Sequence, residues 1–317
     1  MVANAFSAVI MIFILMAIGF LVSKTKWYSE SAQSYISKLV LNVTLPCTIA
    51  VAFLKNFTPG MVVSYAPAFL VAACATMATY FAARLVARIM KVKRDRLGVF
   101  LMLITVSNCG FIGIPVSHVL FGDEGIVPTI IIFLVQSIII NTIGYLDISA
   151  DADCEVKPDR KTILKRIFNP LLLTSLGCAT IASLGVSLDV LPYFISNTLV
   201  LIDGITAPLS LIFIGMVMGS LGIKNLKFQK DMPVIFVMRF VAAPLFILLF
   251  GVLFRLDGFT VQVLTVIGAL SSMVQVAILA KAAGAKLKYA VTGIFYTTIL
   301  NLAAIPIYVI ITSNLLL

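Results

Sequence analysis

Residues 97–120 read LGVFLMLITVSNCGFIGIPVSHVL, and this stretch decides how the whole chain is interpreted. It is apolar over the length of one membrane crossing, which needs about 20 residues. Its middle is polar and rich in residues that disfavour a helix: Ser107, Asn108, Gly110, Gly113 and Pro115. Glycine destabilises a helix by about 1 kcal/mol and an interior proline by about 3 kcal/mol. We therefore predict a spanning helix whose hydrogen-bond ladder breaks into a short unwound stretch.

The predicted break lies at the centre of the bilayer. At 1.5 Å per residue, Ser107 is about 15 Å from Leu97, which is half of a hydrocarbon core of about 30 Å. Irregular backbone survives at this depth only where protein buries it or where it lines a watery cavity. The break therefore indicates either close helix packing or a binding site.

The rest of the chain has the composition of this helix. Of the 317 residues, 61% are hydrophobic and 11% are charged, which excludes a soluble globular protein. Ten apolar segments, numbered here in chain order, are each long enough to cross a bilayer. They span residues 3–23, 32–54, 61–84, 97–120, 125–147, 168–188, 193–221, 233–254, 259–281 and 289–312. The predicted fold class is an all-α polytopic membrane protein with ten transmembrane helices.

Lys and Arg residues are concentrated in every second loop. Five alternate loops hold nineteen of them, whereas the opposite loops hold only Lys55 and Arg255. Because cytoplasmic loops carry the positive excess, we predict a multi-pass protein of the cell membrane with both termini outside. The net charge of +10 then reflects topology, so we expect membrane lipid and not nucleic acid as a partner. Segment 1 has basic residues only after it, which favours a spanning helix over a signal peptide.

The longest polar stretch divides the ten segments into two halves of five. We predict a first repeat at residues 1–147, a cytoplasmic linker at 148–167 and a second repeat at 168–317. An odd number of helices in each half places the halves in opposite orientations, which is an inverted-topology repeat.

A short internal similarity supports this repeat. A Thr-x-Pro motif occurs at residues 44–46 and again at 206–208, an offset of 162. The same offset carries residues 107–115 of segment 4 onto 269–277 of segment 9, which is also polar and interrupted. Broken helices at matching positions in two repeats indicate a transporter's binding site. If the two cross, the N-termini of their half-helices would direct amide groups at an anion; for one such helix alone, close packing is the alternative.

Segment 4 also resembles a known signature. Residues 107–115 are similar to the asparagine-glycine-phenylalanine-x-glycine-x-proline motif in the fourth helix of the auxin efflux carrier family, whose bacterial members include malate- and malonate-permease-like proteins. The resemblance extends through residues 42–46, 169–170 and 208–210. Family members usually carry a proline at the crossover in segment 9 and often an asparagine four residues later; this chain has Ser271 and Gln275.

The resemblance implies a fold similar to that of bile-acid sodium symporters. Segments 1, 2, 6 and 7 would form a scaffold, and segments 3–5 and 8–10 a transport domain. Substrate would bind where the broken helices 4 and 9 cross, and the transport domain would make an elevator-like movement.

We therefore predict a secondary transporter that moves a small organic anion, a carboxylate, by alternating access. Asn108 and exposed amides would hold the carboxylate, Gly110 and Gly113 would allow close backbone approach, and Pro115 would keep the ladder open. The full set of candidate substrate-binding residues is Asn108, Cys109, Gly110, Gly113, Pro115, Ser271, Ser272, Gln275 and Gln136. No cofactor is expected beyond a coupling ion, H⁺ or Na⁺, for which the candidates are Asp203, Asn42 and Thr206.

Each of the other ionisable residues in the segments has two possible roles. Asp203 is the one carboxylate deep within a segment, and either a bound ion or hydrogen bonds in the scaffold would explain it. Lys38 and Arg239 are about 9 to 10 Å from their cytoplasmic helix ends, so we expect their charges to reach the headgroups. His118, near the outer end of segment 4, suits a solvated helix end better than a gate.

Enzyme classes find little support. The chain has no nucleotide-binding or zinc-protease motif, and its five cysteines lack the spacing of a metal or disulfide framework. With one histidine and one deep carboxylate it lacks a buried acid and base pair. Two alternatives stay open: a ligand-sensing membrane protein that binds the same anion without moving it, and a sodium-coupled symporter of steroid-like acids. A homodimer and the direction of transport also stay open.

Overall fold

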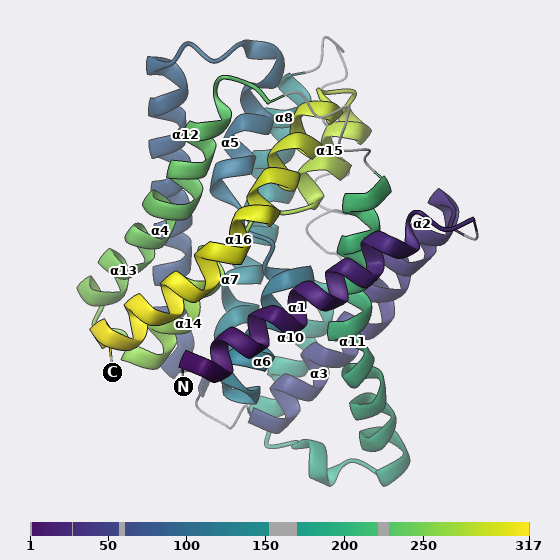
Figure 1. The fold of residues 1–317 in the computed structure, drawn as a ribbon. Helices are drawn as coiled ribbons and strands as arrows, with labels where there is room; N and C mark the ends of the chain where they lie inside the picture. The colour runs from purple at the N-terminus through teal and green to yellow at the C-terminus, as the bar shows by residue number, and fades with distance from the viewer. Residues whose placement is uncertain (1, 27, 57–60, 152–169, 221–227, 317) are drawn as a thin grey trace.

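The computed structural model describes residues 2–26, 28–56, 61–151, 170–220 and 228–316, and the fold is built from helices (Figure 1). Within these ranges every regular element is a helix, and one isolated antiparallel bridge joins two of the breaks. The ends of α1 and α16 that carry the termini lie toward the same end of the molecule in Figure 1. The all-α class predicted from composition is therefore confirmed.

The five segments of the first half are all helical. Segment 1 is α1 (Val2–Val22), and segment 3 is α4 (Met61–Ile89). Segments 2, 4 and 5 are each divided by a wider, π-helical turn. Segment 2 consists of α2 (Glu30–Leu39), η1 (Val40–Thr44) and α3 (Leu45–Asn56); segment 4 of α5 (Leu97–Thr105), η3 (Cys109–Gly113) and α6 (Ile114–Phe121); and segment 5 of α7 (Ile126–Ile139), η5 (Ile140–Gly144) and α8 (Tyr145–Ala150).

The five segments of the second half are also helical in the described residues. Segment 6 is α10 (Pro170–Ser183), segment 7 is α11 (Tyr193–Ser220), and segment 10 is α16 (Leu287–Leu316). Segment 8 consists of α12 (Met232–Val237), η8 (Met238–Ala242) and α13 (Ala243–Leu253), and segment 9 of α14 (Gly258–Gly268) and α15 (Gln275–Ala283).

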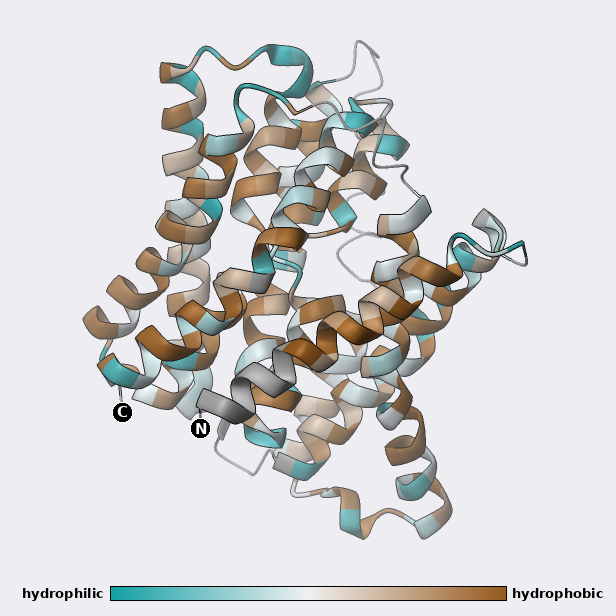
Figure 2. Cartoon of the chain, viewed as in Figure 1, coloured by the Kyte–Doolittle hydropathy of each residue, from teal (hydrophilic) through white to brown (hydrophobic). Residues whose placement is uncertain are grey.

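Five helices of the described chain are long and apolar enough to cross a membrane by length and composition. They are Ser31–Lys55, Ser64–Ile89, Asp123–Ala150, Tyr193–Ser220 and Met232–Leu253. A bent pair within α16 would make a sixth. Figure 2 shows apolar residues along most helices and hydrophilic residues at helix ends and loops, as expected for a protein whose outer surface faces lipid. The protein is thus a multi-pass membrane protein, while the count of ten crossings and the inverted repeat stay predictions.

Two groups of helices pack closely within themselves. In the first, α1 lies along α11, and a Cβ atom added to Gly19 would be 1.9 Å from the carbonyl oxygen of Ile212. Small residues allow helix backbones in membranes to approach this closely. The same group includes α3, which packs on α10 and α11. In the second group α4 packs against α5, α7 and α13, and α14 against α13 and α16. The predicted division into a scaffold of segments 1, 2, 6 and 7 and a transport domain of segments 3–5 and 8–10 stays a prediction.

Segment 5 is longer than predicted. Its last helix continues to Ala150, three residues past the predicted boundary at residue 147, and Asp151 is buried beside it. This helix lies against the start of segment 4, because a Cβ atom on Gly98 would be 2.2 Å from the backbone carbon of Asp147. The rest of the predicted linker, including Cys154, lies outside the described residues, and so does Asn169 at the predicted start of segment 6.

Candidate functional site

Segments 4 and 9 are both broken, and their breaks cross. The Asn108 amide donates to the Ser271 carbonyl at 2.8 Å, and the Met273 amide donates to the Val106 carbonyl at 3.1 Å. These two bonds form the isolated antiparallel bridge that places Ser107 opposite Ser272. The crossing on which the sequence interpretation depends is therefore present. The paired residues are 165 positions apart, three more than the offset of 162 found in segments 2 and 7.

Segment 9 breaks with Ser271 at the position where the family resemblance leads us to expect a proline. The Ser272 hydroxyl donates to the Leu103 carbonyl at 2.6 Å, and the Ser272 amide donates to the hydroxyl of Thr297 at 3.2 Å. Segments 4 and 10 thus satisfy the polar groups that leave the helical ladder. Because buried backbone groups need partners, these bonds stabilise an unwound stretch that local sequence alone only weakly favours.

A cavity of about 240 Å³ lies on one side of the crossing. It adjoins the first turns of η3 and α15 and the π-helical turn η1 of segment 2. Its lining is largely apolar and carries no Lys, Arg, Asp or Glu among the described residues: Leu41, Asn42, Leu45, Asn108, Gly110, Phe111, Phe133, Ser137, Met273, Gln275 and Ile278. We call this side of the crossing, with Asn108, Gly110 and Gln275, the cavity face.

Asn108 is the polar group most available to a ligand on the cavity face. The residue is 1% exposed, and neither its amide nitrogen nor its amide oxygen has a hydrogen-bond partner among the described residues. Buried side-chain amides are nearly always hydrogen-bonded, so an unpartnered one beside a cavity indicates a site for a bound group or water.

Two helix N-termini also lie at the cavity face. The first turn of a helix has amides without an internal partner and a partial positive charge. Gly110 and Phe111 belong to the first turn of segment 4's second half, and Gln275 opens α15. The cavity therefore combines neutral polar side chains with electropositive backbone, which suits an anion.

Gln275 is held in place by segment 5. Its side-chain nitrogen donates to the Asn141 side-chain oxygen at 2.9 Å, and the Asn141 nitrogen donates to the Ser137 carbonyl at 2.8 Å. Since the Gln275 nitrogen is directed to Asn141, its side-chain oxygen is the group left for other contacts.

Gly110 and two aromatic rings shape the apolar part of the cavity. A Cβ atom on Gly110 would be 3.1 Å from the Phe133 ring, closer than an ordinary van der Waals contact. The Phe111 ring packs against Phe213 of α11 at a centroid distance of 5.1 Å. The wall of the cavity is thus continuous with the contact between segments 4 and 7.

Arg239 occupies a second face of the same crossing. It is 0% exposed, and its guanidinium donates to the carbonyls of Leu270 at 2.9 Å and Ile104 at 2.6 Å, and also to that of Gly268. These carbonyls belong to the C-terminal ends of α5 and α14. The expectation that Arg239 reaches the headgroups is therefore wrong. Depth counted along segment 8 does not reveal that two neighbouring helices end there and need hydrogen-bond donors.

Gln136 lies on the same side as Arg239. Its side-chain oxygen accepts from the Ser107 amide at 2.7 Å, the Ser107 hydroxyl at 3.0 Å and the Cys109 thiol at 3.3 Å. Gln136 and Arg239 line a separate small space with Thr105 and Gly268. We call this side, defined by Arg239 and Gln136, the capping face.

The cavity is thus lined by three of the nine candidate substrate-binding residues: Asn108, Gly110 and Gln275. Gln136 and Cys109 instead hold the break, and Ser272 holds segment 9. The remaining three are buried outside the cavity lining: Gly113, Pro115 and Ser271.

The coupling-ion candidates separate into two places. The Thr48 hydroxyl is 2.6 Å from the Asp203 carboxylate and 2.9 Å from the Thr206 hydroxyl, so these three form a cluster between α3 and α11. Asn42 instead lines the cavity and donates to the Lys38 carbonyl at 2.8 Å. In the described ranges, no three His, Cys, Asp or Glu side chains form a group that could hold a metal ion.

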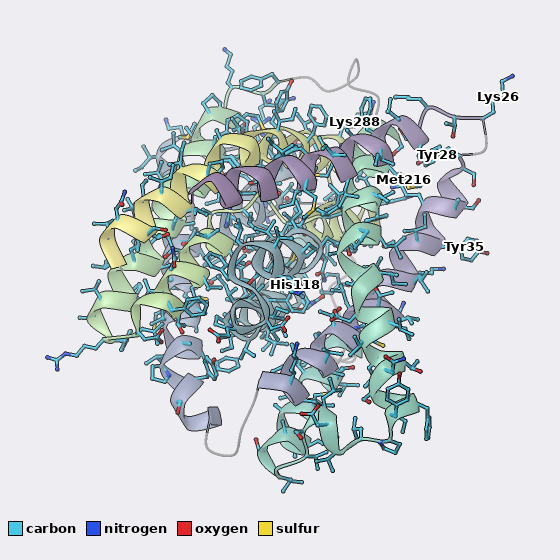
Figure 3. The ribbon with its side chains drawn as sticks, turned by 60° about the horizontal axis from the view of Figure 1, so that its bottom comes forward. Lys26, Tyr28, Tyr35, His118, Met216 and Lys288 are labelled. Atoms are coloured by element: carbon cyan, nitrogen blue, oxygen red, sulfur yellow. The ribbon has the colours of Figure 1, made fainter. Side chains whose placement is uncertain are left out.

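His118 lies at the end of segment 4 that carries no basic loop. Figure 3 views the molecule from this end and shows His118 near the centre. Its side chain is 52% exposed and 3.2 Å from the Asp123 carboxylate, which also pairs with Lys55. This agrees with a solvated helix end. The ion pair between Lys55 and Asp123 also joins segment 2 to the loop between segments 4 and 5.

Asp151 caps the other end of α5, a role that the sequence did not indicate. Its carboxylate accepts from the amides of Gly98 at 2.7 Å and Val99 at 2.9 Å. Burial raises the pKa of Asp151 to about 6, while the two amide bonds act in the opposite direction. Helix α5 therefore has a carboxylate at its N-terminus and a guanidinium at its C-terminus, each matched to the helix dipole.

Two comparisons with known proteins agree on a broad class. Residues 4–309 match the model of a family described as membrane transport protein. The chain is also 25% identical over 304 residues to a protein of Methanocaldococcus jannaschii named as an uncharacterized transporter, covering 95% of this chain and 96% of that one. The match spans nearly the whole chain and confirms the resemblance drawn from segment 4. The chain therefore belongs to the membrane transport protein family.

Proposed function

We propose that this protein is a secondary transporter of a small organic anion, a carboxylate, which binds at the cavity face of the crossing. Asn108 carries the proposal, because its buried side-chain amide lies beside the cavity and has no hydrogen-bond partner among the described residues. The N-termini of the two second half-helices add partial positive charge. The apolar lining would accommodate the hydrocarbon part of the same molecule.

The position of the cavity supports an elevator-like mechanism. Leu41, Asn42 and Leu45 contribute one wall from segment 2, and the crossing of segments 4 and 9 contributes the other. If segments 3–5 and 8–10 move past segments 1, 2, 6 and 7, a ligand held by Asn108 travels with the crossing. In this proposal the basic loops are cytoplasmic and both termini lie outside.

Asp203 with Thr48 and Thr206 is the proposed site of coupling. A carboxylate that accepts a hydroxyl bond at 2.6 Å could exchange a proton or bind a monovalent cation. Flux measured under imposed proton or sodium gradients distinguishes these two ions, and Asp203→Asn should abolish the coupling while leaving counterflow of the anion intact.

The proposal is tested by reconstituting the purified protein in proteoliposomes and measuring counterflow of a panel of radiolabelled carboxylates. Asn108→Ala should reduce counterflow at least tenfold, because the buried, unpartnered side-chain amide that lines the cavity is lost. Asn197→Ala, in segment 7 outside the cavity lining, is the matched control and should behave as wild type. Unchanged counterflow in Asn108→Ala would exclude the assigned role, and binding without flux in the wild type would favour a sensor.

A further inference from the structure

Arg239 carries a charge that the described residues do not neutralise. Its guanidinium is fully buried and bonded to three carbonyl oxygens, and in the described part of the chain no Asp or Glu forms an ion pair with it. A carbonyl dipole satisfies a donor but does not cancel a unit charge. Burying an uncompensated charge is costly, so its position suggests that the protein uses it.

The charge lies close to the cavity face. Arg239 bonds to Leu270, and the carbonyl of the next residue, Ser271, accepts from the Asn108 amide at 2.8 Å. One residue of backbone and two hydrogen bonds thus separate the guanidinium from the backbone nitrogen of Asn108, a path of about 12 Å along the bonds. The described cavity lining carries no charge of its own, so Arg239 is a fixed, buried positive charge directly behind the residues that would face a ligand.

We propose that Arg239 sets the charge selectivity of the cavity, by placing one uncompensated positive charge behind the crossing while it holds the ends of α5 and α14 together. This inference rests on the proposed function and deepens it, because it assigns the preference for an anion to a residue that never touches the ligand. Arg239 is therefore a positioning and selectivity residue rather than a ligand-contacting one.

The test measures the electrical potential at the cavity without needing the substrate. Ile278 lines the cavity and is about half exposed, so Ile278→Cys introduces a reactive thiol there. Its reaction with an anionic sulfonatoethyl and a cationic trimethylammonioethyl methanethiosulfonate is followed in proteoliposomes by peptide mass spectrometry, so the native cysteines can stay. Each rate is divided by that of the same reagent with a free thiol in solution.

We call the corrected rate of the anionic reagent divided by that of the cationic reagent the corrected ratio. With Arg239 present, this ratio should be greater than one. Arg239→Gln, which keeps donors but removes the charge, should lower the ratio about tenfold, as expected for one charge acting at about 10 Å in a partly aqueous site. Arg239→Lys should retain the ratio. Arg88→Gln is the matched control: it removes an exposed positive charge from α4 and should leave the ratio unchanged.

Two results would overturn the inference. One is a corrected ratio of one in the Ile278→Cys protein that keeps Arg239. This measurement does not depend on whether a variant of Arg239 folds. The other is a ratio that Arg239→Gln and Arg88→Gln change equally, with folding verified by circular dichroism. Counterflow distinguishes failure of the proposed function from failure of this inference. The expected ratios in a protein without counterflow would contradict the proposed transport but not the role of Arg239. Normal counterflow with a ratio that Arg239→Gln does not change would contradict the role of Arg239 but not the transport.

Discussion

The cavity face and the capping face of the crossing are made from the same two stretches of backbone, but their polar groups differ in how they are satisfied. On the capping face, Arg239 and Gln136 make six hydrogen bonds to the broken segments. On the cavity face, both polar atoms of Asn108 lack a partner among the described residues. A satisfied face stabilises the fold and an unsatisfied one is free to bind, so stability and binding should be separable by mutation.

The largest expected effect is on the capping face. Arg239→Met keeps much of the side-chain volume but leaves three buried carbonyls without a donor, each costing about 1 to 3 kcal/mol. We expect the free energy of unfolding to fall by at least about 3 kcal/mol, measured as thermal unfolding in detergent. The exposed Arg88→Met is the control, and equal losses in the two variants would contradict the capping role.

The second prediction compares two side chains of similar kind. Gln136→Leu leaves the backbone amide of Ser107 without a partner and its hydroxyl with only the Cys109 thiol, and should cost about 2 kcal/mol of stability. Asn108→Leu removes groups that no described residue satisfies, so it should leave the melting temperature unchanged or higher while abolishing counterflow. A comparable loss of stability in both variants would show that the two faces do not differ in this way.

The third prediction concerns the other end of α5. An unfolded aspartate titrates near pH 3.9, whereas burial raises the pKa of Asp151 in the folded chain to about 6. Between these values the folded state keeps a proton that the unfolded state has lost, so stability should fall by about 2 kcal/mol as the pH rises from 4 to 6 and then level off. Asp151→Asn should remove this part of the pH profile, and an unchanged profile would refute the assignment.

The smallest effect is expected at Gly110. A methyl group there would be 3.1 Å from the Phe133 ring, so Gly110→Ala should narrow the cavity and weaken ligand affinity a few-fold with little change in maximal flux. Phe133→Leu in the same chain should restore affinity by making room. If the double variant is weaker than Gly110→Ala, the contact with Phe133 is not what limits the cavity.

Much of the fold follows from local chemistry. The Gly and Pro residues at 110, 113 and 115 weaken the ladder wherever they occur in a helix, so the break in segment 4 could be placed from the sequence. The break in segment 9 is harder to predict from the sequence, because it depends on hydrogen bonds to Leu103 and Thr297 as well as on Ser272. The helix count and the repeat are pattern arguments that the structure leaves as predictions.

The site was less predictable because a sequence does not show which side of a crossing a polar residue occupies. Asn108 and Gln136 are both amides in apolar segments, yet one lines the cavity and the other closes hydrogen bonds behind it. Arg239 was misplaced for a related reason. Its partners are carbonyls in segments 4 and 9, and backbone carbonyls carry no residue-specific signal.

The capping of α5 links the two halves of the chain. Its N-terminus is capped by Asp151 from the first half, and its C-terminal carbonyl at Ile104 by Arg239 from the second. In a first half produced alone, the Ile104 carbonyl at the C-terminal end of α5 would have no guanidinium donor. Within the membrane, no water would be present to replace that donor. The two halves must therefore mature together, and a chain interrupted between them should yield a working protein only when both fragments are made in the same membrane.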